Sequence, residues 1–365
     1  MGTARLAVWN MEWLNRLFVS GNGPAAFKPD DERPDGRGRV TVGERKADLG
    51  RGLAALDTDL VVVVEGPNRT EELQLLFDDL APGTWTCFVQ RSQSPNGPHR
   101  SDVFSSAQCV GLALRTDRGI WGDDPMRVFD AMDPASGAVH NASEPFFHDT
   151  GADKVPEWYR FERRPAYAEL TLADGARFRV MGLHLKSKGI FSAYEWSRWW
   201  QLADANRERL LAQCRRLREG FLDPYLRDDA TAEMPLIVCG DINDGPGFDT
   251  SEMRLKASGI ETLMGTVWKP RLALGNAVFD TLPPADRDRL NFEDLSTTSF
   301  EDPIFAGTYH RVWIDHILYT RNAPEGWVSE AAIVRDFAGD PVLPYWRVSD
   351  HAPVVATVRL DAPAA

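Results

Sequence analysis

The sequence has few cysteines, no long apolar run and fewer basic than acidic residues. Four cysteines are spread along 365 residues, at Cys87, Cys109, Cys214 and Cys239. Their spacing fits neither a disulfide framework nor a zinc site, so we expect reduced cysteines in the core. No stretch is long enough to span a bilayer, and no apolar signal segment opens the chain. These features predict a soluble, cytoplasmic protein without a membrane anchor, and nothing in the sequence indicates an obligate protein partner.

The charge balance restricts the choice of partners. Lysine and arginine number 41 against 54 aspartates and glutamates, which gives a net charge of −13. An acidic surface repels polyphosphates at long range, so contact with nucleic acid requires a local basic patch or bound cations. Apolar residues make up 43% of the chain and charged residues 26%, as in a globular protein with a substantial core.

One stretch, residues 235–247, combines a buried strand with polar residues. Residues 236–239 form a short apolar run, which predicts a buried strand ending at Gly240. Asp241 and Asn243 follow two residues apart, so in an extended chain their side chains point the same way. Such a pair suits a pocket that holds a cation, a water molecule and an oxyanion. The same residues are also common turn formers, which is the simpler alternative.

Polar residues stand at the ends of several other expected strands. Strands are predicted at residues 6–9, 60–64, 109–114, 166–172, 177–183, 236–239, 311–319 and 354–360. The polar residues at or near strand ends are Asn10, Glu12, Glu65, His184, Asp315, Asp350 and His351. Alternation beyond residue 183 predicts that His184, Lys186 and Lys188 project together, and that His316 packs on the strand face opposite Asp315.

Helices are predicted between these strands, so we expect an α/β protein. A helix is predicted at residues 43–57, and Asn68 with Glu71 resembles a capping pair for a helix that continues to Leu80. A long helix at residues 196–221 has one apolar face. Its arginines at 207, 209, 215, 216 and 218 are expected to be solvated, with contact to nucleic acid as the alternative. An Asp-Gly turn at 174–175 predicts a hairpin and hence some antiparallel pairing.

The clustered acids favour a particular chemistry. Oxygen-rich ligation suits a hard cation such as Mg²⁺ or Mn²⁺, whereas zinc prefers histidine and cysteine. An imidazole beside a carboxylate is oriented and made more basic, which a water-activating general base needs.

Six motifs together resemble those of the endonuclease/exonuclease/phosphatase family. They are Trp9-Asn10-Met-Glu12, Val64-Glu65, His184, Gly240-Asp241-Ile-Asn243, Ile314-Asp315-His316-Ile317 and Ser349-Asp350-His351. They recur in the family's order over nearly the whole chain. The resemblance implies a four-layer α/β sandwich, in which two mixed, mostly antiparallel sheets pack face to face with helices outside. It implies a single domain over residues 1–361, with loop insertions near 18–40, 90–106, 130–160 and 262–309.

The resemblance also implies roles for individual residues. The metal ligands would be Asn10, Glu12, Glu65 and Asp350, with Glu65 the direct ligand. Asp241 would orient or deprotonate the attacking water, and His351 would be paired with Asp315. Contacts to the phosphate would come from His184, Asn243, Arg164 and Lys186, although solvated surface charges are the simpler interpretation of Arg164 and Lys186.

We therefore expect a Mg²⁺- or Mn²⁺-dependent phosphoesterase that uses in-line attack by water. The expected substrate is a DNA phosphodiester, because the His-x-Lys-x-Lys segment at 184–188 resembles the deoxyribonuclease-like members. One alternative is a phosphatase or phosphodiesterase acting on a small ester, such as an inositol phosphate, a nucleotide or a phospholipid headgroup. Another is a non-catalytic binding module.

Overall fold

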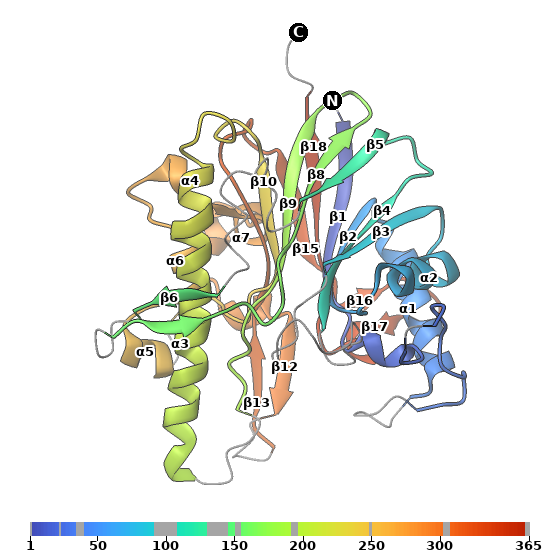
Figure 1. Ribbon diagram of the computed structural model, residues 1–365, viewed down its shortest axis with the longest axis horizontal. Helices are drawn as coiled ribbons and strands as arrows, with labels where there is room; N and C mark the ends of the chain where they lie inside the picture. Colours follow the sequence, from blue (N-terminus) through green and yellow to red (C-terminus); the bar gives the residue numbers. More distant parts are fainter. Residues whose placement is uncertain are drawn as a thin grey trace.

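Two six-stranded mixed sheets form the centre of the computed structural model (Figure 1). The structure describes residues 2–21, 23–33, 40–90, 108–129, 145–149, 155–190, 196–247, 250–301 and 307–361. The first sheet has the strand order β15-β18-β1-β2-β4-β3 and the second has the order β11-β14-β10-β9-β8-β5. Each sheet contains one parallel pair, β1 with β2 and β10 with β9, and its other pairs are antiparallel.

The bounds of the strands follow the apolar runs of the sequence. The first sheet comprises β1 (Gly2–Asn10), β2 (Leu60–Gly66), β3 (Trp85–Gln90), β4 (Cys109–Arg115), β15 (Val328–Ile333) and β18 (Val354–Leu360). The second comprises β5 (Trp121–Val128), β8 (Ala166–Leu172), β9 (Arg177–His184), β10 (Leu236–Asp241), β11 (Gly275–Asn276) and β14 (Asp315–Tyr319). Three two-stranded sheets pair β6 (Phe146–His148) with β7 (Glu157–Tyr159), β12 (Thr298–Glu301) with β13 (Tyr309–Val312), and β16 (Asp336–Phe337) with β17 (Leu343–Pro344).

The helices lie outside the two large sheets. They are α1 (Val42–Leu56), α2 (Thr70–Leu80), α3 (Trp199–Leu217), α4 (Asp223–Tyr225), α5 (Thr250–Leu255), α6 (Gly259–Met264), α7 (Ala277–Thr281) and α8 (Pro284–Arg287). Helices α1 and α2 cover the first sheet, and α3 runs along the second (Figure 1). No helix in the described part of the chain is both long and apolar enough to cross a membrane.

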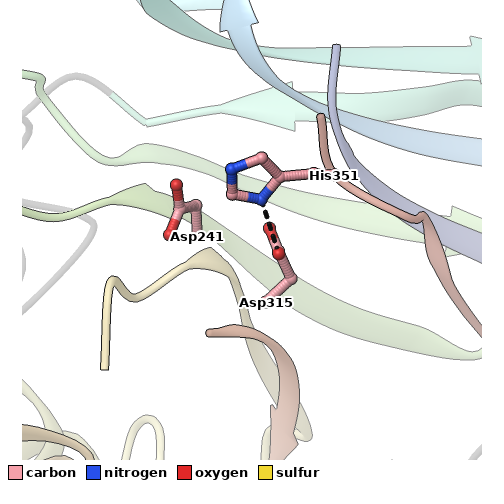
Figure 2. A group of neighbouring side chains, drawn as sticks. All are labelled: Asp241, Asp315 and His351. Carbon is pink, nitrogen blue, oxygen red and sulfur yellow. Dashed lines mark hydrogen bonds and ion pairs between the residues drawn. The ribbon is translucent and has the colours of Figure 1, made fainter. Parts of the chain in front are cut away.

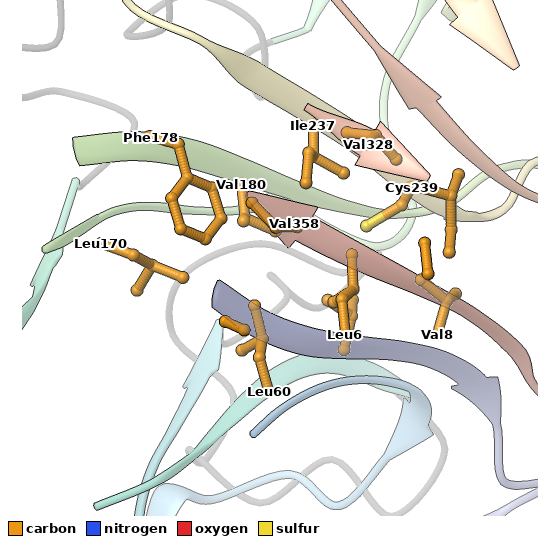
Figure 3. Close-up of a cluster of buried hydrophobic side chains, with 14 of the residues drawn as sticks. Leu6, Val8, Leu60, Leu170, Phe178, Val180, Ile237, Cys239, Val328 and Val358 are labelled. Carbon is orange, nitrogen blue, oxygen red and sulfur yellow. The ribbon is translucent and has the colours of Figure 1, made fainter. Parts of the chain in front are cut away.

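Alternation along the strands builds three apolar layers. In β1, Leu6 and Val8 face the second sheet, whereas Ala7 and Trp9 face the helices. Ile237 and Cys239 face them from the second sheet, as Figure 3 shows. The predicted four-layer sandwich is therefore confirmed.

Three details of the sequence prediction are wrong. Arg69, not Asn68, is the N-cap residue of α2, and the Glu72 side chain accepts from the Asn68 N–H at 3.1 Å. The strand predicted over 311–319 is broken into β13 and β14, because the chain passes there from the small hairpin into the second sheet. The third error concerns the long predicted helix, where Arg207 in α3 and Arg218, directly after α3, are buried rather than solvated. Arg207 meets acids from distant segments, whereas Arg218 meets the distant Leu272 carbonyl group and the nearby Asp223.

The predicted insertions differ from one another in structure. The described part of residues 262–309 contains short helices, the strands β11 and β12 and the first residue of β13, and β11 lies at the edge of the second sheet. The described part of 130–160 forms the β6–β7 pair. Nearly all of 90–106 lies outside the described residues.

Candidate active site

Strand ends from both sheets meet at one edge of the sandwich. In the second sheet, Asp241 is the register partner of His184 on β9 and of Asp315 on β14. In the first sheet, Asn10 ends β1, Glu65 lies near the end of the parallel strand β2, and His351 shortly precedes β18. The register alone therefore collects the predicted polar residues, because the ends of adjacent strands lie side by side.

Hydrogen bonds link the strand ends at this edge, and one of them joins the two sheets. The Asn10 Nδ2 donates to Asp241 Oδ2 across the sandwich at 3.1 Å and to Glu65 Oε1 at 3.4 Å. The Trp9 indole Nε1 donates to the His351 carbonyl oxygen at 3.1 Å. Trp9 and Asn10 are almost fully buried, so these bonds form away from solvent and hold the strand ends together.

Asp241, Asp315 and His351 form the centre of the site. His351 Nδ1 donates to Asp315 Oδ2 at 2.7 Å, and Asp241 lies on the Nε2 side of the ring (Figure 2). Each of the three residues has a potential ligand atom within 4.8 Å of those of the other two, and all three are buried. The Asp315 backbone N–H donates to Thr297 Oγ1 at 3.2 Å, which fixes the start of β14.

The electrostatics of this group are perturbed. Burial and the nearby Asp315 raise the pKa of Asp241 to about 7. Burial opposes a charge on His351, but Asp315, Asp241 and Asp350 raise its pKa well above the usual value. Strongly shifted groups that share a buried position are typical of functional sites.

A second group of acids lies beside the first. The Trp13 N–H donates to Glu65 Oε2 at 2.9 Å, and burial followed by the charge of Asp350 raises the pKa of Glu65. Glu12 is buried, and its backbone N–H donates to Asn10 Oδ1 at 3.0 Å.

The donor set fits a hard divalent cation. The four carboxylates Glu65, Asp241, Asp315 and Asp350 face two cations, His351 and Arg163, so the site has an excess of negative charge. Asp315 Oδ1 is buried and has no hydrogen-bond partner among the described residues. Oxygen donors with uncompensated negative charge match the preference of Mg²⁺ or Mn²⁺.

The backbone is strained where it carries these side chains. Glu12, Trp13, Glu65 and Asn243 have φ angles of 49°, 51°, 54° and 57°, in the left-handed region that non-glycine residues rarely adopt. At Gly240, which precedes Asp241, a Cβ atom would lie 2.0 Å from the Leu183 carbonyl oxygen. Strain of this kind persists where surrounding structure enforces it, often at active sites.

The predicted phosphate contacts lie at different depths. His184 is buried with its Nε2 3.8 Å from Asp241 Oδ2, and burial with the charge of Arg163 lowers its pKa well below the usual value. Asn243 Nδ2 donates to the Leu185 carbonyl oxygen at 3.1 Å. Lys186 is half-buried, and its Nζ donates to the Ser187 carbonyl oxygen at 3.1 Å. Because β9 ends at His184, the alternation that predicted a common direction with Lys188 stops there, and Lys188 Nζ instead lies 2.8 Å from Asp244.

Arg163 is a site residue that sequence reasoning missed. It donates to Gln108 Oε1 at 2.6 Å, and its charge acts on Glu65, Asp241 and His184. Its neighbour Arg164 is the arginine that the sequence analysis named, and its role stays a prediction. The Arg163-Arg164-Pro165 segment marked the place, but the irregular backbone before β8 gave no alternation with which to choose between the two arginines.

Among known proteins, the matches to this chain are solved structures with a similar fold. No family model matches the chain, and no curated protein matches it significantly. A solved endonuclease/exonuclease/phosphatase family protein from Bacteroides thetaiotaomicron is similar over 98% of this chain and 95% of its own, with 14% identity and a TM-score of 0.48. The mannosyl-6-phosphatase of the same organism matches over 98% of this chain and 100% of its own, with 14% identity and a TM-score of 0.47.

A third similar structure is D. rerio TDP2 complexed with single-strand DNA product. It covers 98% of this chain and 99% of its own, with 13% identity and a TM-score of 0.46. At such identities the likeness extends to the fold alone and assigns no activity.

Proposed function

We propose that this protein is a divalent-metal-dependent phosphodiester hydrolase. The observation that supports the proposal best is the buried group of Asp241, Asp315 and His351, with ligand atoms within 4.8 Å of one another. A carboxylate-oriented imidazole beside a second carboxylate is an arrangement suited to activating water and stabilising developing charge.

The residues that would hold the metal are Asn10, Glu12, Glu65 and Asp350. Bound Mg²⁺ or Mn²⁺ would polarise the phosphate and stabilise the leaving oxygen.

The protein's own side chains activate the water and transfer the protons. Asp241 orients the attacking water and accepts its proton as the new P–O bond forms in line with the bond that breaks. Asp315 holds one His351 proton on Nδ1, so Nε2 is the atom that donates to a phosphoryl oxygen and gives its proton to the leaving oxygen as the bond from that oxygen to phosphorus breaks. Burial keeps bulk water away from both groups and strengthens these interactions.

Donors to the phosphate complete the proposed site. His184, Asn243, Lys186 and Arg164 are the predicted donors, and Arg163 joins them because its charge already acts on Asp241 and Glu65. Asn243 would exchange its present contact with the Leu185 carbonyl for a phosphate oxygen. Donors aimed at an oxygen that gains charge accelerate such reactions.

The proposed substrate is a DNA phosphodiester. The resemblance of the 184–188 segment to deoxyribonuclease-like members favours it. A small phosphate ester is the second candidate, favoured by the net charge of −13, which acts against a long polyanion.

Nicking of supercoiled plasmid in Mg²⁺, in Mn²⁺ and with a chelator tests the proposal. Parallel assays use bis(p-nitrophenyl) phosphate, inositol phosphates and nucleotides, with His351→Ala as the inactive variant. We expect metal-dependent nicking that His351→Ala abolishes. Hydrolysis of small esters with intact DNA would shift the assignment to the second candidate. Absence of hydrolysis with every substrate would favour a non-catalytic binding module.

A further inference from the structure

A turn that follows β10 is packed against the start of β14 at the edge of the candidate site. Asp241 and Asp315 are opposite each other in the antiparallel ladder, and the Ile242 N–H donates to the Ile314 carbonyl oxygen at 2.9 Å. Beyond this bond the chain turns through Asn243 and Asp244. The position of the turn therefore sets the position of Asn243, which lies on it, and holds the end of β10 that carries Asp241.

His316 reaches this turn from the strand face opposite Asp315. It is fully buried, and its Nε2 lies 2.9 Å from the Asp244 carbonyl oxygen. Its Nδ1 lies 3.1 Å from Asn276 Nδ2, and the Oδ1 of Asn276 accepts the Phe279 N–H. Because a carbonyl only accepts and an amide nitrogen only donates, His316 must be the neutral tautomer with its proton on Nε2.

The packing around this hydrogen bond is close. A Cβ atom on Gly245 would lie 2.3 Å from the Trp313 carbonyl oxygen, so the turn approaches the connection between β13 and β14 as closely as only glycine permits. The Trp313 ring lies 4.7 Å from the His316 ring, centroid to centroid.

The carboxylate of Asp244 fixes the other side of the turn. Asp244 is fully buried, and its Oδ1 lies 2.8 Å from Lys188 Nζ and 3.0 Å from Arg207 Nη1. Its Oδ2 accepts the Ile260 N–H at 2.8 Å, at the start of α6. Lys188 also belongs to the segment after β9, so this ion pair connects the two segments that carry His184 and Asp241.

We infer that His316 and Asp244 are positioning residues, which hold Asp241 and Asn243 in register with the Asp315–His351 pair. His316 fixes the turn through the Asp244 carbonyl, and the Asp244 carboxylate fixes it through Lys188 and Arg207. Neither residue touches the reacting atoms. The inference rests on the proposed function, since it concerns the placement of the proposed catalytic groups.

A pair of variants that differ by one methylene tests the role of His316. In His316→Gln the amide can still reach the Asp244 carbonyl, whereas in His316→Asn it is too short. The control is Thr320→Val, which removes a buried hydroxyl that accepts the Leu236 N–H at 2.9 Å, just beyond the far end of β14. The control matches the loss of a buried hydrogen bond without touching the turn.

Two measurements are made on each variant. The first is kcat and KM with bis(p-nitrophenyl) phosphate, and the second is the downfield proton resonance of His351 Nδ1–H, which needs no activity. We expect His316→Asn to lower kcat about 10- to 100-fold with KM nearly unchanged, because small misplacements of reacting groups are costly. We expect it to shift the resonance, and expect His316→Gln to restore both toward wild type.

The outcomes separate the two proposals. If His316→Asn and Thr320→Val behave alike in kcat and in the resonance, His316 has no positioning role. If wild-type protein hydrolyses no ester, the proposed function fails, and the resonance alone decides the positioning role. Should His316→Asn not fold, Lys188→Met tests the same turn from its other side, and an unchanged kcat and resonance there would overturn the inference.

Discussion

At the scale of single residues, the two oxygens of Asp315 have different surroundings. Oδ2 accepts from His351 Nδ1 at 2.7 Å, while Oδ1 is buried without a hydrogen-bond partner among the described residues. The first oxygen orients the imidazole, and the second is available to a ligand of the site.

Replacing Asp315 by asparagine tests the first of these roles. Although burial acts in the opposite direction, Asp315 is the main group that raises the pKa of His351. We expect Asp315→Asn to lower that pKa and to reduce kcat about 100-fold or more, the usual range for loss of a positioned acid or base. Titration of the His351 imidazole by NMR and steady-state kinetics measure the two effects. Asp336→Asn, at an exposed position on β16, is the control. An unchanged His351 titration would contradict the assigned pairing.

Glu65 makes a separate prediction about the metal. Burial and Asp350 raise the pKa of Glu65, so its ionised form opposes folding when no cation is bound. The stability linked to this carboxyl is therefore present at low pH and is lost as the pH rises through its folded-state pKa. We expect Glu65→Gln to be at least as stable as wild type without metal at neutral pH.

With metal bound, we expect wild type to be more stable than Glu65→Gln. A cation that binds only the folded state stabilises it by about 2.7 kcal/mol at 100 times its Kd. We expect Mn²⁺ to raise the Tm of wild type and of the control Glu71→Gln, an exposed position on α2, but not that of Glu65→Gln. Differential scanning fluorimetry with and without chelator measures this. An equal rise in all three proteins would exclude Glu65 as the direct ligand.

At the scale of elements, the two sheets approach each other closely at Gly182 on β9. A Cβ atom there would lie 2.8 Å from Val62 Cγ1 and 2.8 Å from Val110 Cγ1 of the opposite sheet. We expect Gly182→Val to lower the free energy of unfolding by about 1–3 kcal/mol, the usual cost of overpacking a core. Urea unfolding measures it against Gly23→Ala, where nothing lies within 4 Å of the added atom. Equal stability of the two variants would show that the sheets separate at little cost.

The strands were the most predictable elements of the chain. The bounds of β8 and β18 match the apolar runs at 166–172 and 354–360, because a buried strand has few alternatives to a short apolar run. The strand ends then indicated the candidate site, since polar residues at the ends of buried strands emerge at a sheet edge. Asp241 ends β10 and Asp315 begins the antiparallel strand β14, so the two meet at the same edge.

Contacts between distant segments were not predictable. The apolar stripe of α3 correctly placed Leu210 and Cys214 in the core, but Arg207 on the flank of the stripe was expected to be solvated. It is buried because Asp244 and Glu252 come to it from segments about 40 residues further along. Periodicity describes one helix at a time and carries no information about which charges meet it.

Lys188, Arg207, Asp244 and Glu252 form a buried cluster of charged groups. This cluster predicts that the free energy of unfolding depends on pH. Burial and the neighbouring Asp244 raise the pKa of Glu252 to about 8, from an ordinary value of 4.5. For Asp244, burial acts in the opposite direction, but Lys188 and Arg207 lower its pKa below the usual range. A carboxyl with a raised folded-state pKa contributes stability below about pH 4.5 and loses it as the pH rises through about 8. We therefore expect Glu252→Gln to gain stability relative to wild type between about pH 5 and pH 9.

Urea unfolding at about pH 5 and about pH 9 measures the stability of Glu252→Gln relative to wild type. Glu261→Gln, at an exposed position on α6, is the control and should show no such trend. A constant difference between Glu252→Gln and wild type across this range would mean that Glu252 is already ionised throughout.

At the scale of the whole molecule, the net charge of −13 acts on every approaching phosphate. Proteins that bind DNA through many basic contacts lose affinity steeply with salt, because counterions are released on binding. Here the long-range field is repulsive, and added salt screens it over a Debye length of about 10 Å at 0.1 M. The proposed site must then attract the scissile phosphate through its few local cations alone.

We therefore expect kcat/KM on plasmid DNA to rise or stay level between about 20 and 200 mM NaCl at constant Mg²⁺. The same range should leave kcat/KM on bis(p-nitrophenyl) phosphate nearly unchanged, because a single charge is repelled only weakly. Initial rates measured with both substrates give the comparison. A steep fall with DNA alone would reveal an extended basic contact surface on this acidic protein and would favour a role for Arg209, the exposed arginine among those predicted to be solvated on α3.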